Sequence, residues 1–184
     1  DLRKGGVFYK CAPTLRDKET VRQMWVMLDK GYVDTIASDH VPTPRHVLEE
    51  STDDLMTKGG GMPQLEHMLN SIMNGVNQGL TNIYTAIQAL TEKPAKIYGL
   101  YPRKGTIQVG SDADLVLVDM NQELKITQEV IISKANRSTF ENMTLKGNPI
   151  LTMVRGEVVV EDRQIVGKPD YGQFVSRVDA TSTT

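Results

Sequence analysis

The chain has 184 residues, of which 39% are hydrophobic and 24% charged, a composition typical of globular proteins with one or two small domains. A net charge of −2 and the lack of a Lys/Arg-rich run exclude an electrostatically bound nucleic-acid partner. The single cysteine, Cys11, excludes an internal disulfide and a cysteine-rich zinc site, and is compatible with the cytoplasmic localisation that we expect. No apolar run has the length of a membrane span and no signal peptide is recognisable, so we expect no membrane partner.

The first forty residues have the pattern of a β-loop-α-β unit. The run Val7–Ala12 is rich in β-forming residues and predicts a short strand. Asp17 can cap a following helix, in which we expect Met24 and Trp25 to lie in the core. A second strand is predicted at Val33–Ala37. Such a unit predicts two parallel neighbouring strands joined by a right-handed crossover.

The second predicted strand leads directly into Asp39 and His40. In parallel α/β architecture the loops at the C-terminal ends of strands converge and carry the chemistry. A carboxylate followed by an imidazole offers a metal ligand or a general base. The alternative is a strand that ends in a polar turn, with Asp39 capping a backbone group and His40 half exposed. Two residues alone do not decide between these interpretations.

Residues 43–61 are polar and irregular and end in a run of glycines, Gly59–Gly61. The glycine run can present backbone N–H groups to an anion or a carbonyl, or it can be a flexible connector. His67 lies beside the apolar stripe of the next helix, where we expect it to face the polar side. Three helical segments are predicted, at Pro63–Gly79, Ile83–Leu90 and Ala95–Tyr98.

From Tyr101 onward the pattern changes from helical to strand-like. This change predicts a boundary near residues 100–105, with residues 1–100 in a first domain, 101–178 in a second and 179–184 as a disordered tail. Strands are predicted at Gly105–Gly110, Ala113–Asp119, Ile150–Arg155, Gly156–Glu161 and Gln164–Gly167.

Six stretches together resemble, in the family's order, the C-terminal part of the cyclic amidohydrolases, the group of dihydroorotase, allantoinase and hydantoinase. They are Lys10–Arg16, Ala37–Pro42, Gly60–Glu66, Thr91–Leu100, Lys104–Val116 and Val154–Val159. The element G-x-I-x-x-G-x-x-A-D-L-V, at Gly105–Val116, is specific to the amidohydrolase superfamily. The motif S-D-H-x-P, at Ser38–Pro42, narrows the resemblance to the cyclic-amide group. The resemblance extends from about Phe8 to Val175.

The resemblance implies an α/β fold: the last two β/α units of a (β/α)8 hydrolase barrel, with strands Val7–Cys11 and Val33–Ala37, followed by the C-terminal part of a β-sandwich. It implies that Asp39 ligates one of two divalent metal ions, zinc being expected, and is the catalytic base toward the bridging hydroxide. This role is physically reasonable because metals lower the pKa of bound water, whose proton a nearby carboxylate can then accept. The residues that the resemblance places around the substrate ring are Cys11, Ala12, Pro13, Arg16, His40, Gly60, Gly61 and Met62.

The family builds the rest of its metal site on earlier strands, from an H-x-H pair, a carboxylated lysine and two more histidines. This sequence has histidines only at positions 40, 46 and 67, no H-x-H, and begins at Asp1. We therefore expect a C-terminal fragment of a longer enzyme that holds no metal and hydrolyses nothing on its own. Strands without neighbours leave open edges, so we also expect self-association into a homo-oligomer.

The substrate that the resemblance implies is a small cyclic amide. Dihydroorotases usually carry asparagine at the position of Ala12 and histidine at the position of Thr43, so their absence favours an allantoin- or hydantoin-like ring. Arg16 is either a partner for a substrate carboxylate or a surface charge. Two alternatives to an enzyme are a non-catalytic relative that serves as a scaffold and a β-rich binding module. The presence of Asp39 and His40 favours the enzyme.

Overall fold

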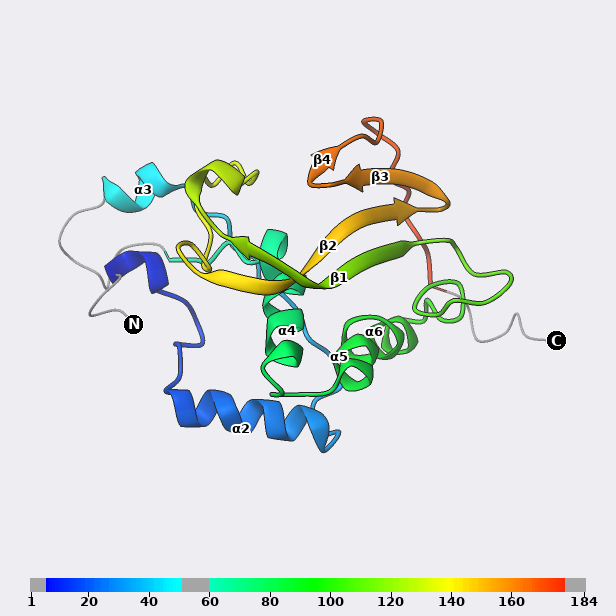
Figure 1. Cartoon of the computed structure of the whole chain (residues 1–184), viewed down its shortest axis with the longest axis horizontal. Helices are drawn as coiled ribbons and strands as arrows, with labels where there is room; N and C mark the ends of the chain where they lie inside the picture. The colour runs from blue at the N-terminus through cyan, green and yellow to red at the C-terminus, as the bar shows by residue number, and fades with distance from the viewer. Residues whose placement is uncertain (1–5, 51–59, 178–184) are drawn as a thin grey trace.

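The computed structural model describes residues 6–50 and 60–177, which form three layers (Figure 1). Helix α2 forms one outer layer, helices α4, α5 and α6 the middle layer, and a four-stranded sheet the other outer layer. The predicted disordered tail and residues 51–59 of the glycine-bearing connector lie outside the described residues. No helix in the described part is both long and apolar enough to cross a membrane. The elements are η1 Gly6–Tyr9, α2 Lys18–Asp29, α3 Arg45–Glu49, η2 Leu65–His67, α4 Met68–Asn77, α5 Ile83–Leu90, α6 Glu92–Ile97, β1 Leu115–Lys125, η3 Gln128–Val130, β2 Thr144–Val154, β3 Glu157–Glu161 and β4 Gln164–Ile165.

Helix α2 forms where the sequence predicts it. The Asp17 carboxylate accepts hydrogen bonds from the Thr20 backbone N and from its hydroxyl, both at 2.9 Å, and so caps the first turn. Trp25 packs against α4 at Gly75, where a Cβ atom would lie 2.7 Å from the indole ring. Met24 is 54% exposed, so its predicted core position is wrong. The contact with α4 at Trp25 leaves Met24 on the solvent side of this outer layer.

The two predicted barrel strands do not form. Residues Gly6–Tyr9 adopt a 3-10 helix, and residues 33–37 have no strand assignment. Ile36 N donates to Ala89 O of α5 at 3.1 Å. A strand needs a ladder of backbone hydrogen bonds from a neighbouring strand, whereas Ile36 bonds to a helix within the described residues. The helix predicted between the two strands is therefore present, whereas neither predicted strand forms.

The helical predictions after residue 60 are largely confirmed. Helix α5 begins at Ile83 as predicted, and the side chain of its N-cap residue Asn82 accepts a hydrogen bond from Thr85 N at 2.9 Å. Helix α6 begins before the predicted Ala95 because Pro94 occupies its first turn, where a missing N–H breaks no helical hydrogen bond. The segment predicted to be irregular contains the short helix α3, which follows Pro44 as its N-cap.

The sheet is an antiparallel meander in the order β1-β2-β3-β4. Four of the five predicted strands are confirmed, and β1 and β2 are longer than predicted, pairing from Leu115 with Met153 to Lys125 with Thr144. The strand predicted at Gly105–Gly110 is wrong. Both of these glycines have positive φ, 83° and 93°, and the chain between them forms turns with Val109 fully exposed.

Helix α4 binds the sheet through three asparagines on one helical face. Asn70 Nδ2 donates to the side-chain oxygen of the buried Asn148 of β2. Asn74 Oδ1 accepts from Lys146 N at 3.0 Å, and Asn77 Nδ2 donates to Lys146 O at 3.1 Å. Buried polar groups destabilise a fold unless they are hydrogen-bonded, so these pairs fix the position of α4 along β2.

The same helix touches β2 at a glycine. Gly147 has φ +97°, and a Cβ atom at this position would lie 2.6 Å from the Cβ atom of Met73, which is fully buried. Real Cβ atoms essentially never approach this closely, so any larger residue must push α4 away from the sheet.

We predict that Gly147→Ala lowers the free energy of unfolding by about 3 kcal/mol, through backbone strain and the clash with Met73. Gly156→Ala is the matched control, since Gly156 also has positive φ, +84°, but has nothing within 4 Å of an added Cβ. The control should lose about 1 kcal/mol from backbone strain alone. Urea unfolding followed by circular dichroism measures both, and equal losses would contradict the close approach.

Candidate functional site

The described residues line an open pocket of about 290 Å³ whose walls come from three chain segments. One wall follows η1, the second follows residues 33–38, and the third precedes η2. The pocket contains six of the predicted site residues: Cys11, Ala12, Asp39, Gly60, Gly61 and Met62. The other lining residues are Lys10, Val41 and Gln64. The fold therefore brings these six residues, which come from separate sequence motifs, together at one pocket.

Asp39 is the only acidic residue that lines the pocket within residues 6–50 and 60–177. Its side chain is exposed, and its φ of +44° lies in the left-handed region, which aspartate tolerates better than most residues. The chain therefore turns sharply at Asp39 itself. This geometry places one carboxylate at the pocket, where it can accept or donate a proton.

The glycines of the third wall allow the walls to approach closely. A Cβ atom at Gly60 would lie 2.6 Å from Lys10 O, and one at Gly61 would lie 2.5 Å from Cγ1 of Val41. Gly61 N donates to Lys10 O at 2.8 Å. The backbone N–H of Gly61 is therefore engaged by the neighbouring wall in this structure and does not point at a ligand.

Two further hydrogen bonds join the second and third walls. Val41 N donates to Met62 O at 3.2 Å. The Thr43 hydroxyl donates to Gly60 O at 2.8 Å. Together with the bond from Gly61 to Lys10, they hold the three walls to one another without an intervening strand ladder.

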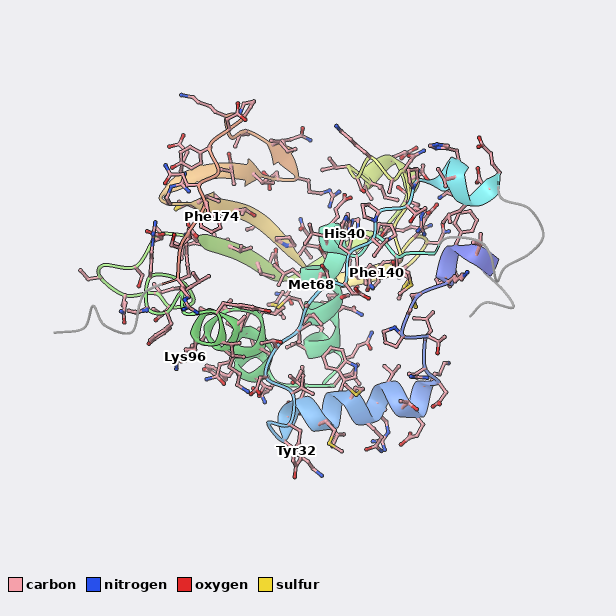
Figure 2. The ribbon with its side chains drawn as sticks, turned by 180° about the vertical axis from the view of Figure 1, so that it is seen from behind. Tyr32, His40, Met68, Lys96, Phe140 and Phe174 are labelled. Atoms are coloured by element: carbon pink, nitrogen blue, oxygen red, sulfur yellow. The ribbon has the colours of Figure 1, made fainter. Side chains whose placement is uncertain are left out.

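Three predicted substrate-binding residues lie outside the pocket lining. His40 Nδ1 accepts from Gln64 N at 3.2 Å and from Leu65 N at 3.1 Å, so the ring binds the backbone at the start of η2. Figure 2 shows His40 beside the N-terminal part of the helix that follows. Pro13 and Arg16 are exposed, and neither lines the pocket.

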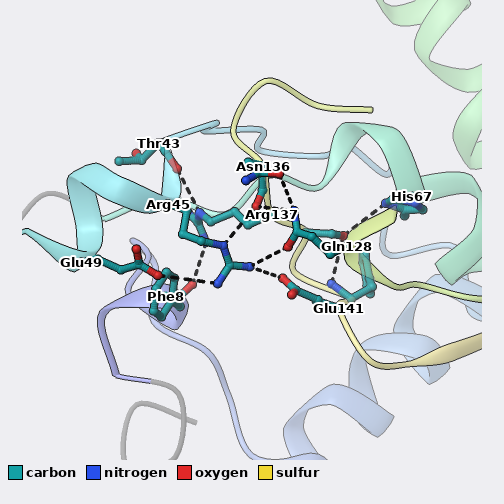
Figure 3. A network of polar contacts seen from close by, with 11 residues as sticks. Phe8, Thr43, Arg45, Glu49, His67, Gln128, Asn136, Arg137 and Glu141 are labelled. Atoms are coloured by element: carbon teal, nitrogen blue, oxygen red, sulfur yellow. Dashed lines mark hydrogen bonds and ion pairs between the residues drawn. The ribbon is translucent and has the colours of Figure 1, made fainter. Parts of the chain in front are cut away.

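Sequence reasoning missed Arg137, whose guanidinium hydrogen-bonds to backbone carbonyls in or next to the pocket walls; Figure 3 shows it beside Phe8 and Thr43. Arg137 is only 3% exposed. Nε donates to Thr43 O at 2.9 Å, Nη1 donates to Phe8 O at 3.2 Å, and Nη2 donates to Gly61 O. Burial, together with the charge of nearby Arg45, lowers the pKa of the Arg137 guanidinium. No sequence signal marks this arginine, because it lies in a loop between predicted elements.

A second arginine lies beside the first. The Cζ atoms of Arg45 and Arg137 lie 5.5 Å and 5.8 Å from the centre of the Phe8 ring, distances typical of cation–π contacts. Arg45 forms an ion pair with Glu141 at 2.6 Å and donates from Nε to Asn136 O at 3.1 Å. Its hydrogen bonds therefore reach the 128–141 loop and not the pocket walls.

His67 is buried, so the prediction that it faces the polar side is wrong. It is 1% exposed, and its Nδ1 lies 3.2 Å from Ser138 Oγ, while Nε2 lies 3.7 Å from Oε1 of Glu66. The loop that carries Ser138 covers a helical face that would be polar in an isolated helix. Burial lowers the pKa of His67 below its ordinary value.

The described residues contain no group of three or more histidine, cysteine, aspartate or glutamate side chains placed to hold a metal ion. On their own they do not fit a metal centre, and Asp39 is the one acidic side chain that they bring to the pocket. The predictions of two ions in a longer enzyme, and of none bound to this chain alone, both stay predictions.

The amidohydrolase family model matches residues 8–159, and the chain therefore belongs to this family. It is 39% identical over 178 residues to an L-hydantoinase of Paenarthrobacter aurescens, covering 96% of this chain and 39% of that protein. It is also 39% identical over 171 residues to a dihydroorotase of Pyrococcus horikoshii, covering 93% of this chain and 38% of that protein. The resemblance found in the motifs is confirmed.

Solved structures agree with the fold. The L-hydantoinase (dihydropyrimidinase) from Arthrobacter aurescens superposes with a TM-score of 0.90 at 38% identity, covering 96% of this chain and 39% of that chain. A D-hydantoinase superposes with a TM-score of 0.88 at 33% identity, covering 94% and 38%. The chain thus spans about two fifths of the length of the relatives that it matches.

The burial of His67 predicts that acid destabilises the fold. Its pKa is lowered from 6.5, so below that pH the unfolded chain binds more protons than the folded one, and the free energy of unfolding falls as the pH falls. Above pH 6.5 this contribution is fully present. His67→Gln should remove this part of the pH dependence in urea unfolding at a series of pH values. His46→Gln, at an exposed position, should keep it, and equal slopes for the two variants would contradict the assignment.

Proposed function

We propose that this chain supplies the substrate-binding walls and the catalytic carboxylate of a hydrolase that opens cyclic amide rings by cleaving a C–N bond. The observation that carries the proposal is the convergence of Asp39 with the two motif-bearing walls around one pocket. Membership of the amidohydrolase family and relatives named hydantoinase and dihydroorotase support it.

The chemistry requires a proton to move from water to nitrogen. A water oxygen adds to the amide carbonyl carbon, the C–N bond breaks, and the ring nitrogen leaves with a proton. In this proposal the Asp39 carboxylate accepts the proton from the attacking water and delivers it to the leaving nitrogen, so that it is regenerated after each turnover. The same proposal makes Asp39 a ligand of one of two divalent metal ions, which we expect to be zinc. This role depends on residues outside the described ones.

The small volume of the pocket is compatible with a small ring. At about 290 Å³ its volume is at the lower end of the usual range for ligand sites. Ala12 offers only a methyl group at the position where, by the family resemblance, dihydroorotases usually carry asparagine, and the Thr43 hydroxyl is hydrogen-bonded to Gly60 O. These two residues support a hydantoin- or allantoin-like substrate over dihydroorotate.

We also propose that the first hundred residues correspond to the closing part of a (β/α)8 barrel and residues 101–178 to part of a β-sandwich. The change from helices, which end with α6 at Ile97, to strands, which begin with β1 at Leu115, supports this division. Segments 7–11 and 33–37 would become strands only beside neighbouring strands that complete their backbone ladders.

A chimera tests the proposed activity. This chain replaces the matching 178 residues of the Paenarthrobacter L-hydantoinase, and the metal-loaded protein is assayed with hydantoin, allantoin and dihydroorotate. We expect ring opening of hydantoin or allantoin by the chimera and none by this chain alone. A folded chimera that opens none of the three rings would favour the non-catalytic scaffold.

We predict that Asp39→Asn in the chimera lowers kcat by about a thousandfold, because the amide cannot accept the proton from water. Asp34→Asn is the control, since Asp34 precedes the pocket in the same segment, is 68% exposed at its side chain and only faces Lys93 at 3.6 Å. The control should keep kcat within about twofold, as surface substitutions usually do. A kcat for Asp39→Asn close to that of the unmodified chimera excludes Asp39 as the base.

A further inference from the structure

The chain segments that form or adjoin the three walls of the pocket share one hydrogen-bond donor group. Phe8 lies two residues before the first wall, Thr43 lies two residues after Val41 in the second, and Gly61 belongs to the third. The carbonyl oxygens of Phe8, Thr43 and Gly61 all accept from the guanidinium of Arg137. Arg137 itself lies far along the chain, in the loop between η3 and β2.

We propose that Arg137 is a positioning residue: it sets the spacing of the three walls and thereby the affinity of the pocket for the substrate ring. Arg137 does not line the pocket, so it acts through the backbone of the walls and not by touching the ligand. This inference rests on the proposed function, because it takes the pocket to be the site that holds a cyclic amide.

The chemistry of the side chain fits this role. A guanidinium is a planar group with five N–H donors in a fixed geometry, so it can bind three carbonyl oxygens at once. A lysine ammonium at the same place is a compact point charge on a flexible stem and cannot hold the same three directions. Without Arg137, the buried carbonyl of Gly61 and the part-buried carbonyls of Phe8 and Thr43 lose this partner, and the walls must separate to admit water.

The neighbouring Arg45 provides a control that distinguishes positioning of the walls from a general contribution to stability. Arg45 lies over the same Phe8 ring at a similar distance, 5.5 Å. Its side-chain hydrogen bonds go to Asn136, Gln128 and Glu141, none of which lines the pocket. Replacing Arg45 therefore removes a cation from the same cluster while leaving the three wall carbonyls bound.

The first experiment measures kinetics in the chimera. Arg137→Lys, Arg137→Met and the matched control Arg45→Met are assayed with hydantoin. We expect both Arg137 variants to raise KM by about tenfold or more, since small displacements of binding groups have large effects, and to change kcat by less than about threefold. Arg45→Met should leave KM within about twofold of the unmodified chimera. If Arg137→Met does not fold, Arg137→Lys decides.

The second experiment needs neither metal nor activity. Hydrogen exchange by NMR on this chain reports the inter-wall bonds through the amides of Gly61 and Val41, which donate to Lys10 O and Met62 O. Arg137→Lys should speed exchange at these two amides by about tenfold or more, while amides within α5 keep their rates. Arg45→Met should leave the same two amides unchanged.

The outcomes separate this inference from the proposed function. If the unmodified chimera opens no ring, the proposed function fails, and exchange at Gly61 and Val41 alone decides whether Arg137 positions the walls. If the chimera is active but Arg137→Lys keeps its KM, or if the two amides keep their exchange rates, Arg137 is not a positioning residue. An equal rise of KM in Arg45→Met would also overturn the inference, since that change leaves the wall carbonyls bound.

Discussion

The geometry of the site depends on one buried guanidinium that binds three carbonyl oxygens from distant parts of the chain. Each of these carbonyls lies within or next to a loop, and loops have no ladder of their own to fix their position. A charged donor in a site of low exposure makes stronger hydrogen bonds than a neutral one. The cost of burying the charge is visible in the lowered pKa of Arg137, and the three acceptors offset it.

Helix α4 provides the frame that carries this network. It is held between two glycine contacts, with Trp25 of α2 against Gly75 on one side and Met73 against Gly147 of β2 on the other. Because each contact is made at a glycine, which has no Cβ atom, the three layers pack at short distances. The asparagines on α4 supply the hydrogen bonds that determine its register on the sheet. Residues just before α4 form the third wall, so the layer packing also places the pocket.

Local signals were sufficient for helices α2, α4, α5 and α6 and for the short connections of the sheet, but not for the short helix α3. The cap at Asp17 and the apolar spacing of α5 depend only on neighbouring residues, and the sequence shows them. The strands predicted at Val7–Ala12 and Val33–Ala37 failed because strand formation requires a partner that composition cannot supply. His67 was misjudged because the loop that buries it, at Ser138, lies about seventy residues away in the sequence. Arg137 was missed because the segments that bury it, such as the one at Thr43, also lie far away in the sequence.

The bonds that join the walls come from backbone groups, from the Thr43 hydroxyl and from Arg137, whereas the side chains of Ala12 and Met62 line the pocket without taking part in them. The atoms that join the walls are thus different from the side chains that, in the proposed function, face the substrate ring. A substitution that reshapes the cavity to suit another ring substituent need not disturb the scaffold around it. Under the proposed function, this arrangement would let the cavity change to accept other members of one chemical series while the bonds between the walls stay in place.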